Sequence, residues 1–172
     1  ISWGSLAAGD DAKAQASSDE KTDEAPATEA TPTEGPWLIV DIGIIGTASE
    51  DILLDAIADA EEADYAGVVI KLDTPGGALE NTRGMVKAMM AAPFPVGVWV
   101  GPAGSRAGSA GAFITIAGPV ASMAPGTNIG AAHPVQAGGQ EVEDDEMKRK
   151  ITNDTVAFIE SIAERRGRNV DM

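Results

Sequence analysis

The stretch "AGVVIKLDTPGG" (residues 66–77) decides the fold of this chain. Its first seven residues are almost continuously apolar, as in a strand that is buried on both faces of a parallel sheet. The "DTPGG" that follows has the composition of a turn, because proline fixes φ and glycine adopts backbone angles closed to other residues. A buried strand followed by such a turn indicates an open α/β sheet, whose ligand crevice lies beyond the carboxyl ends of the strands.

The segments on either side of this stretch complete an α/β pattern. Strands are predicted at residues 37–43 and 95–101, and helices at residues 49–63 and 78–92. Strands that alternate with helices in this way require crossover connections, so we expect a parallel sheet with crossover helices. A further helix is predicted at about residues 147–166.

The spacing of apolar residues predicts which helix faces are buried. In the first helix Ser49 is the expected N-cap, and the expected buried face is Ile52, Ala56, Ile57 and Ala60. In the last helix the expected buried face is Ile151, Thr155, Ile159, Ile162 and Ala163.

The chain divides into a tail and one domain. Residues 1–36 are mostly small, polar and acidic, so we expect a signal-peptide remnant followed by a disordered acidic spacer. The alternative for the first residues is an ordinary disordered start. Residues 37–172 form the expected folded domain, which we take to be truncated at its C-terminus. A spacer after an export signal predicts that the domain lies outside the cytoplasm.

Composition excludes several classes of function. The net charge of −15 argues against binding to nucleic acid, which requires a basic surface. The chain has no cysteine, so a thiol nucleophile and a disulfide framework are both excluded. No apolar run reaches the roughly 18 residues that a membrane-spanning helix needs.

The "DTPGG" turn is a candidate oxyanion site. Gly76 and Gly77 leave their backbone N–H groups accessible, and backbone N–H groups stabilise oxyanions in many enzymes. The alternative is a plain glycine-rich connection between a strand and a helix, which this motif alone favours.

The stretch "GPAGSRAGSAG" (residues 101–111) contains two candidate nucleophiles, Ser105 and Ser109. Ser109 directly precedes "AGAFITIAG", which can begin a helix, so its side chain would lie near unpaired N–H groups. The alternative is that Ser109 is an ordinary helix N-cap. A phosphate-binding loop is disfavoured, because no Gly-Lys-Ser or Gly-Lys-Thr follows the glycines.

A serine nucleophile needs a base, and the residues alone leave its identity open. His133 is the only histidine of the chain. Lys148 and Lys150 are the alternatives, although a lysine accepts a proton only where desolvation or like charge makes it neutral. A third interpretation is that residues 148–150 ("KRK") form a solvated charge patch at the start of a helix.

The motifs "LDTPGG", "GSRAGSAGAFI", "MAPGTNIGAAHPV" and "KITNDTVAFIESIAERRGRN" occur in this order from about Trp37 to the end of the chain. Together they resemble the NfeD-like membrane-bound serine proteases of the ClpP class, the stomatin operon partner proteins. The resemblance implies a ClpP/crotonase-like fold and a Ser-Lys dyad of Ser109 and Lys150. It also implies an oxyanion hole formed by Gly76 or Gly77 together with the N–H of Ala110.

The resemblance further implies what the protein acts on and where. Apolar peptide segments are the expected substrates, and a stomatin-like membrane protein is the expected partner. The full-length protein would be membrane-associated and homo-oligomeric, and the dyad would require no cofactor or metal.

Residues 136–146 are the expected lid over the substrate groove. We expect the acidic side chains of this lid to point to solvent and away from Lys150.

Two other functions are alternatives to a protease. One is a non-catalytic membrane-tethered scaffold of the same fold. The other is a crotonase-type acyl-CoA enzyme, which shares the backbone oxyanion hole but needs no serine.

Overall fold

The computed structural model of the chain describes residues 34–131 and 145–170. Four parallel strands form the main sheet in the order β1-β2-β3-β5. They are β1 (Trp37–Ile42), β2 (Gly67–Leu72), β3 (Val96–Val100) and β5 (Ala121–Met123). The predicted α/β fold with a parallel sheet is therefore confirmed, and β2 occupies a central position as its apolar sequence requires.

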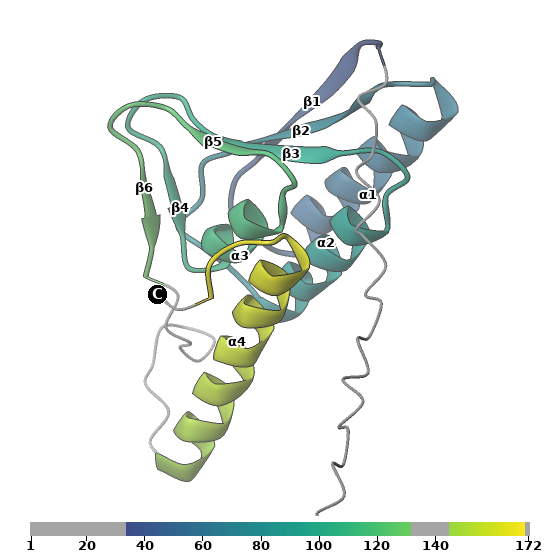
Figure 1. The fold of residues 1–172 in the computed structure, drawn as a ribbon. Coiled ribbons are helices and arrows are strands. Elements are labelled where there is room, and N and C mark those ends of the chain that lie inside the picture. Colours follow the sequence, from purple (N-terminus) through teal and green to yellow (C-terminus); the bar gives the residue numbers. More distant parts are fainter. Residues whose placement is uncertain (1–33, 132–144, 171–172) are drawn as a thin grey trace, which may run out of the picture.

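Three helices connect these strands and lie against one face of the sheet (Figure 1). They are α1 (Thr47–Glu62), α2 (Leu79–Ala91) and α3 (Ala110–Ala117). Each crossover moves to the next strand in the same direction along the sheet. Because crossovers of parallel strands share one hand, successive steps in one direction place all their helices on the same face.

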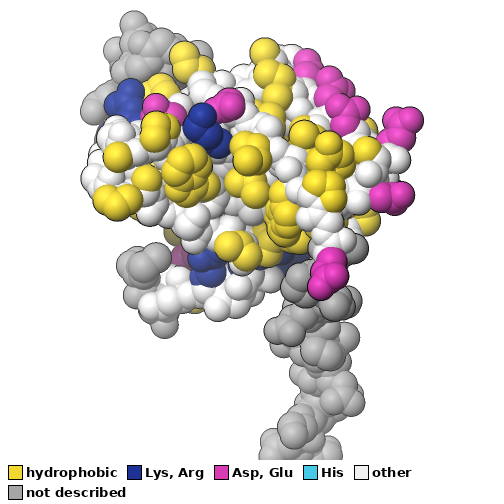
Figure 2. All heavy atoms as spheres, turned by 90° about the horizontal axis from the view of Figure 1, so that it is seen from above, with side chains coloured by type: hydrophobic (Ala, Val, Ile, Leu, Met, Phe, Trp, Pro, Cys, Tyr) yellow, Lys and Arg dark blue, Asp and Glu magenta, His cyan; other side chains and the backbone are white. Residues whose placement is uncertain are grey.

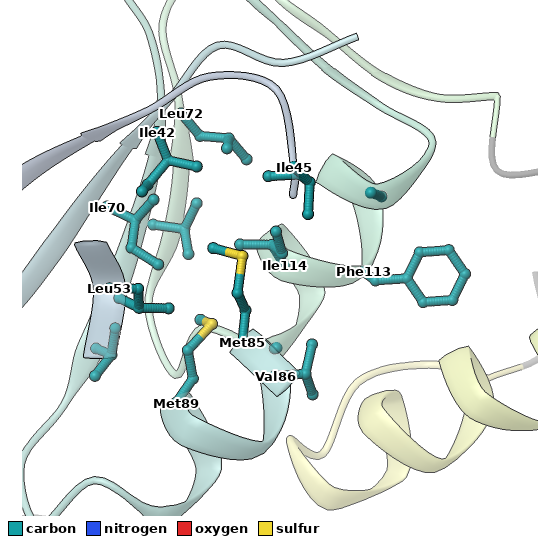
Figure 3. Close-up of a cluster of buried hydrophobic side chains, with 14 of the residues drawn as sticks. Ile42, Ile45, Leu53, Ile70, Leu72, Met85, Val86, Met89, Phe113 and Ile114 are labelled. Carbon is teal, nitrogen blue, oxygen red and sulfur yellow. The ribbon is translucent and has the colours of Figure 1, made fainter. Parts of the chain in front are cut away.

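The core fills the space between the sheet and these helices (Figure 3). Ile70 and Leu72 of β2 point into it, and Leu53 of α1 and Met85 of α2 meet them from the helices. All four side chains are fully buried. Phe113 of α3 points the other way, toward the last helix.

The last helix, α4 (Asp145–Arg165), packs against α3 and α2 with its C-terminal half. The ring of Phe158 stacks on that of Phe113 with centroids 5.5 Å apart, and the Arg83 guanidinium lies over Phe158 at 4.2 Å. Arg83 also pairs with Asp154 at 2.6 Å. The predicted face of α4 is confirmed, because Thr155, Ile162 and Ala163 are buried and Ile151 and Ile159 are half-buried.

Two arginines just after the end of α4 bond carbonyls at the C-terminal end of α3. Arg166 Nε donates to the Ala117 carbonyl at 2.6 Å, and Arg168 Nη2 donates to that of Gly118 at 2.8 Å. Burial lowers the pKa of the Arg166 guanidinium, and the nearby charges of Arg165 and Arg168 lower it further. Together with the stacking of Phe113 on Phe158, these bonds place α4 in the same direction as α3.

Some local predictions were wrong. Helix α1 begins at Thr47 with Gly46 as its N-cap, so Ser49 lies inside the first turn. From there Ser49 Oγ accepts from the Gly46 N–H at 2.9 Å, which caps the helix by a different route. The buried stripe of α1 is Ser49, Leu53, Ala56 and Ala60, whereas Ile52 is 47% exposed.

Helix α4 begins at Asp145, two residues before the predicted start. The structure also contains three strands of three residues that were not predicted: β5 of the main sheet, β4 (Arg106–Gly108) and β6 (Asn128–Gly130). Strands β4 and β6 pair in parallel as a small second sheet beside the carboxyl ends of the main strands.

Candidate functional site

The "DTPGG" loop connects β2 to α2 and is held by its own threonine. Thr74 Oγ1 accepts a hydrogen bond from the Gly76 N–H at 3.0 Å and donates to the Gly76 carbonyl at 3.1 Å. Gly76 has a φ of +123°, which glycine adopts without the penalty that a side chain would impose. A Cβ on Gly77 would lie 1.9 Å from the Ile45 carbonyl oxygen, so the loop also passes close to the segment before α1.

The loop lies directly beside the strand that leads to Ser109. The Thr74 N–H donates to the Arg106 carbonyl at 2.7 Å, and the Gly108 N–H donates to the Thr74 carbonyl at 2.9 Å. A Cβ on Gly76 would lie 2.8 Å from Ser109 Cβ and 3.3 Å from Ser109 Oγ. Two motifs that are 33 residues apart, at Gly76 and Ser109, are therefore in contact.

Ser109 occupies the junction between β4 and α3. Its φ of 48° and ψ of −111° are unusual for a residue other than glycine. A serine on a sharp strand-to-helix turn is the arrangement by which several hydrolases expose a nucleophile. The Ser109 N–H donates to the Gly130 carbonyl of β6 at 2.7 Å, which holds the turn from the other side.

The hydroxyl of Ser109 is not used as a helix cap. Ser109 stands at the N-cap position of α3, but its side chain makes no capping hydrogen bond. The capping alternative raised by the sequence is thus not what the structure contains. Ser109 is half-buried.

Two backbone N–H groups beside Ser109 lack acceptors. Within the described residues, the N–H of Gly77 and the N–H of Ala110 donate no hydrogen bond, whereas the N–H of Gly76 is bound to Thr74. Ala110 is the first residue of α3, where N–H groups are unpaired and the helix dipole favours negative charge. Of the two loop glycines, Gly77 is therefore the one that can donate to an oxyanion.

Lys150 lies in the second turn of α4, and within the described residues no hydrogen bond joins its side chain to Ser109. Its side chain is 68% exposed, and Nζ pairs with Glu146 Oε1 at 2.8 Å. The expectation that the acids of residues 136–146 stay away from Lys150 is wrong for Glu146, because the two residues are one helical turn apart. The parallel packing of α3 and α4 nevertheless puts Ser109 and Lys150 toward the same end of the helix pair.

The other candidates are placed as follows. His133 and most of the expected lid lie outside the described residues. Lys148 is exposed on the first turn of α4, and Ser105 is buried in the turn before β4 with only 5% of its surface accessible. No set of three or more metal-binding side chains gathers anywhere in residues 34–131 or 145–170.

Sequence reasoning missed Thr74 and the β6 carbonyl at Gly130. A signal for Thr74 was present, because threonine two residues before a turn glycine commonly bonds to the backbone of that turn. Gly130 carried no comparable signal, since a glycine-rich segment gives no strand periodicity.

The family model for the NfeD1b N-terminal domain matches residues 45–172. This chain belongs to the NfeD1b N-terminal domain family. It is 38% identical over 113 residues to the membrane-bound protease PH1510 of Pyrococcus horikoshii, an alignment that covers 66% of this chain and 26% of that protein. It is 31% identical over 88 residues to the membrane protein NfeD1b of Bacillus subtilis, covering 51% of this chain and 20% of that protein.

Solved structures support the same family. The fold matches that of the 1510-N membrane-bound stomatin-specific protease, as a lysine-to-alanine variant in complex with a substrate peptide, with a TM-score of 0.72 and 32% identity. That match covers 79% of this chain and 63% of the other. A serine-to-alanine variant matches with the same TM-score and identity over 80% of this chain and 67% of the other.

These two variants replace a lysine and a serine of the 1510-N protease. The serine and the lysine are separated by the same number of residues as Ser109 and Lys150 of this chain. This NfeD1b-family chain spans a fifth to a quarter of the curated relatives' length. Those relatives are described as membrane proteins, and none of the helices in the described part of this chain could span a bilayer.

Proposed function

We propose that this chain is the protease domain of a membrane-associated serine endopeptidase that cleaves apolar peptide segments. One observation carries the proposal: Ser109 presents an uncapped hydroxyl on a strained turn, with the unpaired N–H groups of Gly77 and Ala110 beside it. A nucleophile with backbone donors near it is an arrangement that acyl transfer uses.

In the proposed mechanism Ser109 Oγ attacks the carbonyl carbon of a peptide bond while Lys150 Nζ takes the hydroxyl proton. The N–H groups of Gly77 and Ala110 stabilise the oxyanion that forms. Lys150 then gives its proton to the leaving amine, and an acyl-enzyme remains. Water hydrolyses that ester, with Lys150 again as the base and Ser109 as the leaving group.

This assignment places one requirement on the protein. Lys150 accepts a proton only as the neutral amine, a form that water and a nearby carboxylate both disfavour. The side chain must therefore leave Glu146 and turn toward the α3 end at which Ser109 lies. A bound peptide that covers this end would exclude water from the lysine at the same time.

The relatives support a peptide substrate and a stomatin-like partner. The 1510-N protease is stomatin-specific and binds a substrate peptide. We extend this to the present chain, with a peptide segment as substrate and a stomatin-like membrane protein as partner. The location that we propose for the domain, outside the cytoplasm, rests instead on the acidic composition of residues 1–36.

A non-catalytic scaffold is the second candidate, and the exposed, ion-paired state of Lys150 favours it. The experiment that separates the two is hydrolysis of a peptide with apolar residues on both sides of the scissile bond by the full-length protein. Ser109→Ala and Lys150→Ala are each expected to lower kcat/KM by about a thousandfold or more.

Lys148→Ala is the matched control, because it removes the same charge from the same part of α4. It should stay close to the parent rate. Parent-like hydrolysis by Ser109→Ala or by Lys150→Ala would contradict the proposed dyad, and no hydrolysis or acylation of the parent would favour the scaffold.

A further inference from the structure

Thr74 is fully buried at the point where the "DTPGG" loop meets the strand before Ser109, with 0% of its surface accessible. Its hydroxyl bonds both the N–H and the carbonyl of Gly76, two residues farther along the chain. A hydroxyl that both accepts from and donates to one residue fixes the orientation of the peptide groups on either side of it. One of those peptide groups carries the N–H of Gly77.

The backbone and the methyl group of Thr74 hold the nucleophile side of the site. Its N–H and carbonyl bond Arg106 and Gly108, the first and last residues of β4. Its Cγ2 would be 2.6 Å from a Cβ on Gly111, so the first turn of α3 packs directly on this methyl. Among the described residues, Thr74 is thus the only one that is hydrogen-bonded both to the Gly76 carbonyl and to β4, the strand that leads to Ser109.

We propose that Thr74 is a positioning residue that sets the Gly77 N–H for the oxyanion, an inference that rests on the function proposed above. Its hydroxyl occupies the N–H of Gly76 and orients the Gly76 carbonyl. The peptide group between Gly76 and Gly77 then has its N–H directed away from that carbonyl and left without a partner. Thr74 does not touch substrate itself.

The role predicts what loss of the hydroxyl does. Without it the buried N–H of Gly76 has no acceptor, and a buried unpaired donor is unfavourable enough to drive the loop into another arrangement. The Gly76 carbonyl would keep its bond from the Ile45 N–H, at 3.0 Å. The loop would therefore stay attached to the segment before α1, but the peptide that carries the Gly77 N–H would lose one of the two hydrogen bonds that orient it.

The test compares Thr74→Val with Thr74→Ser in the full-length protein, using the same apolar peptide. Valine keeps the shape and loses the hydroxyl, whereas serine keeps the hydroxyl and loses the methyl against Gly111. We expect Thr74→Val to lower kcat by about 10- to 100-fold, less than the loss of a whole oxyanion donor, with KM changed less than about threefold. Thr74→Ser should stay within about threefold of the parent kcat.

Thr115→Val is the matched control. Thr115 is also buried, and its hydroxyl donates to the Gly111 carbonyl at 2.7 Å inside α3. The Thr115→Val variant also loses a buried hydroxyl but leaves the "DTPGG" loop intact, so the kcat of this variant should match that of the parent. If Thr74→Val does not fold, Thr74→Ser and Thr74→Ala give the same comparison, because both lack the methyl and only serine keeps the hydroxyl.

Opposite results would overturn the inference. A packing role alone predicts a parent-like Thr74→Val and an impaired Thr74→Ser. A role for the Gly76 N–H as oxyanion donor predicts that Thr74→Val, which frees this N–H, is as fast as the parent or faster. In either case Ser109→Ala stays inactive, so the proposed function stands; a parent-like Ser109→Ala would instead overturn both.

Discussion

At the scale of single residues, the strain at Ser109 is the feature that most distinguishes the site. The backbone of Ser109, at φ 48° and ψ −111°, is held there by the hydrogen bond that its N–H donates to the Gly130 carbonyl of β6 and by contact with Gly76. Such strain persists where the surrounding structure over-determines it, and functional sites are where it concentrates.

This strain predicts that Ser109→Gly is more stable than Ser109→Ala by about 1 kcal/mol, because glycine tolerates the backbone angles. Both variants lack the nucleophile, so the comparison isolates the backbone. Denaturant unfolding of the two proteins measures the difference. An alanine variant as stable as the glycine variant would mean that Ser109 is not strained.

The contact between Gly76 and Ser109 predicts a second residue-scale effect. Gly76→Ala and Gly104→Ala both place a side chain at positive φ, at +123° and +90°, but only the first meets another residue, since the space around Gly104 is open. Each should lose about 1–3 kcal/mol of stability. Only Gly76→Ala should also slow acylation of Ser109 by a fluorophosphonate, and equal acylation rates in the two variants would contradict this arrangement.

The sequence predicts the positions of these residues better than it predicts their conformations. Ser109 was predictable as the residue before a helix, because the apolar run after it signals one. Its backbone angles and uncapped hydroxyl were not, since they depend on contacts with Gly76 and Gly130 from distant parts of the chain. The same limit applies to choosing between Gly76 and Gly77, which the Thr74 hydroxyl decides.

At the scale of elements, long segments were predictable and short ones were not. The strands β1, β2 and β3 and the helices α2 and α4 follow from apolar runs and helical spacing. The strands β4, β5 and β6 have three residues each, which is too short for a recognisable periodicity. Strands β4 and β6 pair with each other, and the Thr74 backbone and the Ser109 N–H form further hydrogen bonds to β4 and to β6 respectively.

The docking of α4 depends on Arg83, which lies over Phe158 and pairs with Asp154. Arg83→Met keeps the aliphatic packing and removes the guanidinium, and Lys87→Met removes the same charge from an exposed position one turn along α2. We expect about 1 kcal/mol of lost stability for the first and less than about 0.5 kcal/mol for the second. Chemical denaturation measures both, and equal losses would contradict a specific role for Arg83.

At the scale of the whole molecule, the helices α1, α2 and α3 cover one face of the sheet, and Figure 2 looks onto the opposite side. Hydrophobic side chains gather on this side in the described part of the chain. Ile39 of β1 is 64% exposed, and Val120, just before β5, is 66% exposed.

The net charge of −15 predicts how stability responds to salt. The ion pairs Lys71–Asp41, Arg83–Asp154 and Lys150–Glu146 are partly or largely exposed and contribute little. Repulsion among the excess acidic groups therefore dominates, and salt screens it. Raising NaCl from about 20 to 300 mM should raise Tm by about 2–4 °C in a thermal melt, whereas a fall in Tm would show that the ion pairs dominate.

The central claim is that Ser109 is the nucleophile of a protease. Labelling of the full-length protein with a fluorophosphonate, followed by peptide mapping of the modified residue, tests it most directly. The account predicts one modified serine, Ser109, with labelling abolished in Ser109→Ala and retained in Ser105→Ala. Modification of another residue, or hydrolysis of the apolar peptide by a protein whose Ser109 stays unlabelled, would contradict it.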